Sequence, residues 1–534
     1  MSGANGAAGG KNRTVLIVSM IIVIGFTLFG AVFPDALAVG VNAVNSFLCD
    51  DLGWFYLIMT FAFLIFGLAI AISKYGKIRL GRDDEKPEFS NFQWFALLFG
   101  GGIGIGLVFW AVAEPMIHYA TGPMDDPFTA EAMRTGMRLA FMHEGVHCWG
   151  LFGVVGLALA YAQYRKNRPF LISSSFYPLI GERVNGWIGY TVDIISVFAT
   201  VFGISTSLGL GALQIAGGFG YIWAIETNPA FTAILIGIIT AVFTLATVSG
   251  LHKWMAKIVN IKVWLAVAFM VFLLVFGGFV FIMQHMTDTL GAYISSFIGQ
   301  SLWYGDPEWL SSWTVFYWAW WIAWSPFCGQ FFARVSRGRT VRQMVLGGTF
   351  LPAGFSFFWM TIYGGAAFFQ DAASGGAIQA AVNNDYTTAL YALLQQLPLY
   401  QVTGPLALFL VLICFVGAAD SATFVLPMLT MGGEMDPPKK YRAFWGIAQG
   451  AVTIVLILAG GEAALKTLQT ASVVAAFPFI FVLIFMCAGI YISLKQEFDP
   501  DADTTPLMDR RKKKKDRVPE EPETLEALEA PDGA

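Results

Sequence analysis

The chain has 534 residues, of which 56% are hydrophobic and only 13% are charged. A soluble domain carries about 25% charged residues, so this composition places the chain in lipid and leaves no large soluble domain for separate chemistry. The net charge of −4 conceals a basic run at 510–517 that precedes an acidic end. This run would bind anionic lipid or act as a topogenic stop, and we expect no nucleic-acid partner.

Twelve apolar runs have about the 20-residue length that crosses the hydrocarbon layer of a bilayer. In chain order, these predicted spans 1 to 12 lie near 14–33, 54–73, 94–113, 138–162, 187–213, 230–248, 259–283, 313–333, 346–369, 404–430, 442–460 and 468–493. The first run lacks a small-residue cleavage site, so we interpret it as a span and not as a signal peptide.

Basic residues follow every second predicted span. They occur at 74–86, 165–168, 253–257, 334–342, 439–442 and 510–517, whereas the intervening loops contain only Arg134 and Lys466. Because cytoplasmic loops retain Lys and Arg, both termini are predicted to be cytoplasmic in a multi-pass protein of the inner membrane. The partly apolar segment 284–312 is predicted to include a helix that lies along the outer membrane face.

Two spans contain residues that break helices. Span 3 holds a dense glycine cluster, which weakens a helix by up to about 1 kcal/mol per residue and frees carbonyl groups for a ligand. Close packing of helices through small residues is the alternative interpretation. In span 8, Pro326 is predicted to interrupt the helix beside four tryptophans. Secondary transporters build solute sites from such discontinuous helices. The residues concerned are Gly100, Gly101, Gly102, Gly104 and Gly106 in span 3, and Trp318, Trp320, Trp321 and Trp324 in span 8.

The four tryptophans lie in the middle of span 8, whereas an interfacial aromatic belt would lie at its ends. Indole faces attract quaternary ammonium groups by roughly 0.5–2 kcal/mol per ring. A methylated ammonium has no N–H group that needs a hydrogen-bond acceptor. The cluster therefore predicts a choline-like or betaine-like solute.

The segment 316–327, which reads Phe-Tyr-Trp-Ala-Trp-Trp-Ile-Ala-Trp-Ser-Pro-Phe, resembles the signature helix of the betaine/choline/carnitine transporter family. Further matches are Ala113-Glu-Pro115, the Ser-Leu-Gly-Leu-Gly-Ala-Leu-Gln segment at 207–214 and the Ala-Asp-Ser-Ala-Thr-Phe segment at 419–424. The resemblance covers all twelve spans.

This resemblance implies an all-α integral membrane protein with the LeuT fold, usually a homotrimer, that transports an osmolyte such as glycine betaine, choline or carnitine and is not an enzyme. Two leading helices at 14–93 would precede inverted five-helix repeats made of spans 3–7 and 8–12. The repeats would occupy 94–283 and 313–493, on either side of the outer segment 284–312, with cytoplasmic tails at 1–13 and 494–534.

The resemblance also implies a solute cage. It would comprise Trp318, Trp320, Trp321 and Trp324 of span 8, Gly102, Gly104 and Gly106 of span 3, and Trp149 and Phe152 of span 4. The chain departs from the family where Glu144 replaces a tryptophan. A carboxylate inside a span is a functional candidate that could attract a cationic solute or exchange a proton. Alternatively, it pairs with His143, His147 or Arg138 and stabilises the bundle.

A second departure concerns the coupling ion. In sodium-coupled relatives, carbonyls of the span 3 break, here near Gly100 and Ile103, meet hydroxyls of a Thr-Ser pair in span 10. Gly417 and Ala418 occupy these two positions and lack hydroxyls. Lys262 would replace the cation, or would extend to the cytoplasmic edge of the membrane. Hydroxyls in span 5 are another possible sodium site. They belong to Thr200, Ser205, Thr206 and Ser207. The sequence therefore leaves three driving forces open, namely a sodium gradient, a proton gradient and solute exchange. We expect no other cofactor.

Three alternatives stay open. In the first, the same fold carries a cationic amine or a sulfonium compound, which Glu144 favours. In the second, the protein senses a solute without moving it. A membrane enzyme is the least supported, because the chain has no nucleotide motif and no His, Cys and Asp cluster with metal or nucleophile spacing. Asp193 and Asp420 are expected to bond helix termini or to hold the bundle together, rather than to contact the solute.

Overall fold

The computed structural model describes residues 4–102, 104–249, 252–499 and 503–510, and within them it contains helices and turns but no β-strand. The helices are α1 (Ala4–Val32), α2 (Pro34–Ser46), α3 (Gly53–Ile72), α4 (Asn91–Gly102), α5 (Ile105–Thr121), α6 (Ala130–Glu144), α7 (Val146–Ala160), α8 (Tyr177–Ile180), α9 (Trp187–Trp223), α10 (Pro229–Ser249), α11 (His252–Phe276), α12 (Phe279–Ser301), α13 (Pro307–Ser312), α14 (Thr314–Val335), α15 (Val341–Ala373), α16 (Ala377–Asn384), α17 (Ala389–Gln395), α18 (Tyr400–Thr430), α19 (Lys439–Gly460) and α20 (Ala464–Phe498).

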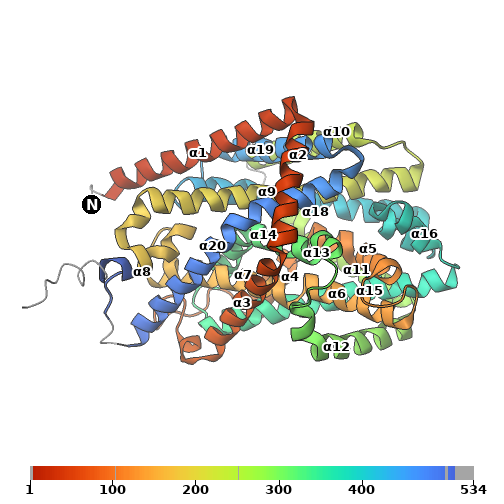
Figure 1. Cartoon of the computed structure of the whole chain (residues 1–534), viewed down its shortest axis with the longest axis horizontal. Helices are drawn as coiled ribbons and strands as arrows, with labels where there is room; N and C mark the ends of the chain where they lie inside the picture. Colours follow the sequence, from red (N-terminus) through yellow and green to blue (C-terminus); the bar gives the residue numbers. More distant parts are fainter. Residues whose placement is uncertain (1–3, 103, 250–251, 500–502, 511–534) are drawn as a thin grey trace, which may run out of the picture.

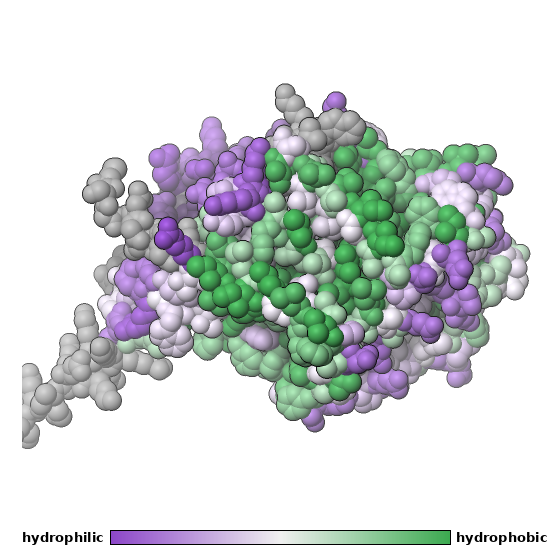
Figure 2. All heavy atoms as spheres, turned by 90° about the horizontal axis from the view of Figure 1, so that it is seen from above, coloured by the Kyte–Doolittle hydropathy of each residue, from purple (hydrophilic) through white to green (hydrophobic). Residues whose placement is uncertain are grey.

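The long helices pack side by side in one bundle, and α14 lies inside it between α7, α9 and α20 (Figure 1). On the face shown in Figure 2, apolar residues cover the middle of the molecule and hydrophilic residues gather toward its two ends. Large apolar side chains are exposed on several helices. They include Ile234, Ile238 and Leu245 of α10 and Ile294 and Ile298 of α12. Apolar surface of this extent is the surface of a protein that contacts lipid.

Eight helical segments of the described residues are long and apolar enough to cross a membrane, or nine if the bent pair α11 and α12 is one span. Each of the twelve apolar runs predicted from the sequence overlaps at least one helix. The tryptophan-rich α14 is not among the eight. Its indole, serine, proline and glutamine side chains make it less apolar than a simple membrane helix. Helices α19 and α20 form one apolar stretch, Lys439–Phe498.

The segment after α11 turns sharply. Helices α11 and α12 meet at an angle of 105°. Gly278 makes this turn with a positive φ of 96°, and a Cβ atom there would lie only 2.6 Å from the ring of Phe369. Helix α12 then packs across α6 and α15, and the short α13 leads into α14.

The glycine cluster of span 3 separates two helices. Helix α4 ends at Gly102 and α5 begins at Ile105, with Gly104 in an extended conformation at the start of α5. This break was predicted. The break predicted at Pro326 was wrong, because α14 continues through the proline. A proline at this position leaves the carbonyl of Ile322 without its helical donor. The hydroxyl of Ser325 donates to that carbonyl at 2.7 Å and so preserves the helix.

A break that was not predicted divides span 4. Helix α6 ends at Glu144, α7 begins at Val146, and Gly145 lies between them with φ −107° and ψ −132°. A Cβ atom at Gly145 would clash with the carbonyl oxygen of Phe141 and with the ring of Phe357. Only glycine fits this junction without a shift of its neighbours.

Loops that the charge pattern assigns to one side of the membrane contact one another. Arg79 donates to the carbonyl of Gly338 at 2.8 Å, and Arg165 donates to the carbonyl of Gly81 at 2.7 Å. Arg165 also pairs with Glu497 at the end of α20, with 2.5 Å between the charged atoms. The loops after α3, α7 and α14 therefore lie together. The first residues of α1 lie at the same end of the molecule as the end of α20 (Figure 1).

Asp193 and Asp420 both make structural bonds of the kind expected of them. Asp193 accepts hydrogen bonds from the backbone N–H and the hydroxyl of Ser173, at 3.0 and 2.9 Å. Asp420 accepts one from the hydroxyl of Thr247 at 2.7 Å. The basic tail beyond Arg510 lies outside the described residues, so its predicted lipid contact stays a prediction.

Replacing Ser325 with alanine should lower the free energy of unfolding by about 1 kcal/mol, because the buried carbonyl of Ile322 would lose its donor. Thermal unfolding of the purified protein in detergent measures this. Ser295 is a matched control: its hydroxyl also donates three residues back, to Ala292, but Ser296 donates to the same carbonyl. Equal losses in S325A and S295A would contradict this role of Ser325.

Candidate functional site at the centre of the bundle

Of the four tryptophans of α14, Trp318, Trp320 and Trp321 are buried inside the bundle and Trp324 is partly buried, and the helical repeat sets them in two pairs. Trp320 and Trp324, four residues apart, both donate their indole N–H to the carbonyl of Gly203 on α9, at 3.2 and 2.7 Å. Trp318 and Trp321, three residues apart, both lie against His143 of α6. The Trp321 N–H donates to the His143 carbonyl at 2.8 Å, and the Trp318 ring lies 5.8 Å from the imidazole.

Trp320 and Trp321 join the two pairs by stacking on each other. Their ring centroids are 4.4 Å apart with an interplanar angle of 16°. Phe152 of α7 meets Trp321 edge-on at 6.1 Å. The polar edges of both indoles are occupied by backbone carbonyls, so their orientation is fixed by hydrogen bonds.

Glu144 lies beside this stack, at the last position of α6. A Cβ atom on Gly106 would lie 2.9 Å from Trp320 and 3.4 Å from the Glu144 Oε1 atom, so the glycine is in contact with both side chains. Glu144 is buried, and its Oε1 atom has no hydrogen-bond donor among the described residues. The structure thus joins Gly106, Glu144, Phe152, Trp320 and Trp321, which we call the central site.

The alternative partners predicted for Glu144 bind elsewhere. His143 lies 2.6 Å from the Glu114 carboxylate, and His147 bonds to the Ser301 hydroxyl at 2.8 Å. Arg138 contacts the Met124 sulfur at 3.6 Å and the Thr135 hydroxyl at 3.4 Å.

Other predicted cage residues flank the central site. Trp318 stacks on His147 with centroids 4.9 Å apart. Trp149 donates to the carbonyl of Glu144 and to the hydroxyl of Ser356, both at 3.2 Å. Trp149 also lies 5.7 Å from the ring of Phe152. Trp324 packs against Phe327 at 5.1 Å.

The predicted span 3 residues surround the break between α4 and α5. Gly100 and Gly102 lie in the last turn of α4, and Gly104 precedes α5. A Cβ atom on Gly104 would have no heavy atom within 4 Å, so this glycine borders open space. Ile103 lies outside the described residues.

The predicted ion residues lie on α11 and α18. Lys262 is buried on α11, a helix that packs against α18, which carries Gly417 and Ala418. On α9, the Thr206 hydroxyl bonds to Ser472 at 2.7 Å, whereas the Ser205 hydroxyl has no partner among the described residues.

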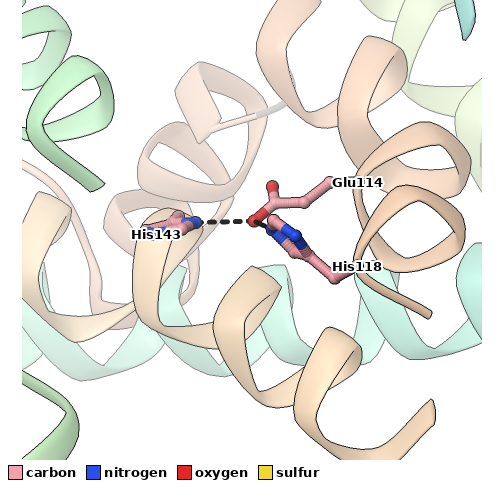
Figure 3. A group of neighbouring side chains, drawn as sticks. All are labelled: Glu114, His118 and His143. Atoms are coloured by element: carbon pink, nitrogen blue, oxygen red, sulfur yellow. Dashed lines mark hydrogen bonds and ion pairs between the residues drawn. The ribbon is translucent and has the colours of Figure 1, made fainter. Parts of the chain in front are cut away.

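A buried cluster that the sequence interpretation missed adjoins the central site. The Oε1 atom of Glu114 on α5 lies 2.6 Å from Nδ1 of His143 and 3.5 Å from Nε2 of His118 (Figure 3). The hydroxyl of Tyr317 donates to the second oxygen of Glu114 at 2.5 Å. The spacing of Glu114 and His118, four residues apart on one helix, is the only sequence signal for it.

A polar cavity of about 710 Å³ lies between the start of α6 and α12. Charged residues line it, namely Asp125, Glu131, Arg134, Arg138 and Asp288. Glu144 lies six positions after Arg138 on α6, which is about 9 Å along the helix. This cavity therefore lies about two turns from the central site.

Comparison with known proteins places the chain in a family. The family model described as betaine/carnitine/choline family transporter matches residues 14–499. A probable glycine betaine transporter of Desulfitobacterium hafniense is 60% identical over 91% of this chain and 98% of its own length. The glycine betaine transporter OpuD of Bacillus subtilis is 44% identical over 91% of this chain and 94% of its own. An ectoine/hydroxyectoine transporter of Virgibacillus pantothenticus is 40% identical over 90% and 95%. The chain therefore belongs to the betaine/carnitine/choline transporter family.

Proposed function

We propose that this protein is a secondary transporter that carries glycine betaine or a related betaine-type solute by alternating access through the central site. The observation that carries the proposal is the buried Glu144 carboxylate beside the stacked rings of Trp320 and Trp321 at a helix break. Relatives that share most of their length with this chain are named for glycine betaine and for ectoine.

The central site offers two kinds of contact to a zwitterionic solute. Indole faces and the Glu144 carboxylate attract a methylated ammonium group. The break before α5 and the break before α7 each leave the first N–H groups of a helix without a helical acceptor. These N–H groups, with the positive end of the helix dipole, favour the carboxylate of a betaine. The site would therefore hold opposite charges at two ends of one small molecule.

The proposed architecture is that of twelve spans with LeuT-like inverted repeats, in the inner membrane and with both termini in the cytoplasm. The contacts between the loops after α3, α7 and α14 support a common side for these loops. Assembly as a homotrimer and binding of anionic lipid to the basic tail belong to the same proposal.

Transport is driven by protons, by sodium or by exchange. The missing hydroxyls at Gly417 and Ala418 argue against sodium at the family's usual position. The buried Lys262 on α11, which packs against the helix that carries these residues, supports a permanent positive charge in place of the ion.

A cationic solute, such as choline, another amine or a sulfonium compound, is the second candidate. Glu144 favours it, because a buried carboxylate with no ion pair among the described residues gains most from a ligand with a net positive charge. A protein that binds its solute without moving it would use the same contacts.

Proteoliposomes that contain the purified protein should accumulate radiolabelled glycine betaine when a proton or sodium gradient is imposed, or exchange it for internal solute when none is. Choline, carnitine and ectoine are compared in the same assay. Binding without uptake or exchange under every gradient would overturn transport and favour a sensor.

Replacing Trp321 with alanine should weaken glycine betaine binding roughly 2- to 30-fold, since one ring contributes about 0.5–2 kcal/mol to a bound ammonium group. Its Kd is measured by scintillation proximity on purified protein. Trp54 is the control, because it is half exposed at the start of α3 and contacts Phe55 rather than the central site. Similar losses in W321A and W54A would reject the central site.

Replacing Glu144 with glutamine should weaken binding of cationic choline roughly 10- to 150-fold, if its contact with the buried charge is comparable to the roughly 1.5–3 kcal/mol of a hydrogen bond to a charged group. Binding of zwitterionic glycine betaine should weaken less, because the same change removes the repulsion between its own carboxylate and that of Glu144. The measurement is the ratio of the two Kd values. Glu131, which lines the polar cavity, provides the E131Q control. An unchanged ratio in E144Q would dismiss the role of Glu144.

A further inference from the structure

Glu114 is the centre of a hydrogen-bonded cluster inside the bundle. Its side chain and those of His118 and His143 are fully buried. One carboxylate oxygen faces both imidazoles, and the other accepts the Tyr317 hydroxyl. The far nitrogen of His143 bonds to the Thr314 hydroxyl at 3.0 Å. Three side chains that exchange protons thus meet at one point without access to bulk water.

The distances favour a proton over a metal ion as the occupant of this cluster. Two ligands bound to a tetrahedral zinc ion at about 2.0–2.1 Å lie about 3.3 Å from each other. The Glu114 and His143 ligand atoms are only 2.6 Å apart, the length of a charge-assisted hydrogen bond. A shared proton fits between them without any movement of the side chains.

Charge balance also requires a proton. Among the described residues, no Lys or Arg forms an ion pair or hydrogen bond with Glu114, so its charge can be neutralised only by a protonated imidazole or by its own protonation. Other titratable groups interact electrostatically with the cluster. They are Tyr317 of α14, Glu144 of α6 and His147 of α7.

The cluster is connected to the central site through two aromatic groups. The Tyr317 ring stacks on His143 at 4.5 Å and lies 6.0 Å from the Trp321 ring. The backbone carbonyl of His143 holds the Trp321 indole. On the other side of Glu114, His118 lies 4.4 Å from Trp313. A change of protonation at His143 would thus act on the group that positions the solute-binding ring.

We propose that Glu114, His118 and His143 form the proton-binding site that couples a proton gradient to solute movement, an inference that rests on the proposed transport function. Protonated His118, whose Nε2 lies 3.5 Å from Glu114 Oε1, delivers its proton to that oxygen and becomes a neutral imidazole. Glu114 then passes the proton across the 2.6 Å hydrogen bond to neutral His143 Nδ1, which leaves the Glu114 carboxylate and the His143 imidazolium. Because Tyr317 and Trp321 both contact His143, the positions of the solute and of the proton depend on each other.

Proteoliposomes that contain the pH dye pyranine and the purified protein test this directly. Wild-type protein should take up protons together with glycine betaine and accumulate it under an inward proton gradient without sodium. E114Q keeps the shape of the side chain but loses its charge. This variant should retain betaine counterflow, which needs no gradient, while its proton uptake and gradient-driven accumulation fall at least tenfold. H118Q should slow proton uptake in the same assay.

His285 provides the matched control, because it is buried on α12 outside the cluster, so H285Q should retain wild-type coupling. Wild-type counterflow without proton uptake would overturn this inference and leave the transport function standing. No betaine uptake or counterflow by the wild type would overturn the transport function itself. The proton site would also be overturned if E114Q and H118Q both kept full coupling. It would be overturned as well if the wild type bound Zn²⁺ and E114Q did not. If E114Q does not fold, the proton uptake of H118Q alone tests the proton site.

Discussion

Hydrogen bonds from indole N–H groups to backbone carbonyls hold the centre of this protein together. In an apolar surrounding, a carbonyl that a helix break leaves without a donor costs several kcal/mol. At the break around Gly145, two indoles supply hydrogen-bond donors. Trp321 donates to the carbonyl of His143, and Trp149 donates to the carbonyl of Glu144. These bonds satisfy the backbone and also fix the rings by their edges. The ring faces are thereby positioned for contact with a ligand, and the carboxylate of Glu144 lies beside them.

The sequence predicted the parts of this arrangement that depend on local chemistry. A dense glycine cluster cannot support a continuous helix, so the break between Gly102 and Ile105 could be expected. The mid-span tryptophans and the exceptional Glu144 identified three members of the central site. The prediction failed at Pro326, because the local rule for proline did not include the hydroxyl of Ser325, which replaces the missing N–H as a donor to the same carbonyl.

Long-range contacts set the limit of the sequence prediction. The break at Gly145 depends on Phe357, which lies on α15, and a single glycine in an apolar run carries no such signal. The cluster around Glu114 joins His143, 29 residues away, to Tyr317, 203 residues away. The family resemblance predicts one cage from the four tryptophans of α14, whereas the helical repeat directs them to two sides. Only the stacking of Trp320 on Trp321 connects those sides.

The account stands on the claim that the solute binds at the central site. Determining the structure of the purified protein with glycine betaine bound, by electron cryomicroscopy in lipid nanodiscs, tests this claim most directly. The account predicts density for the trimethylammonium group against the Trp321 and Trp320 rings, in contact with Gly106 and beside Glu144. Solute density confined to another place, such as the polar cavity between α6 and α12, with the central site closed around its own side chains, would contradict it.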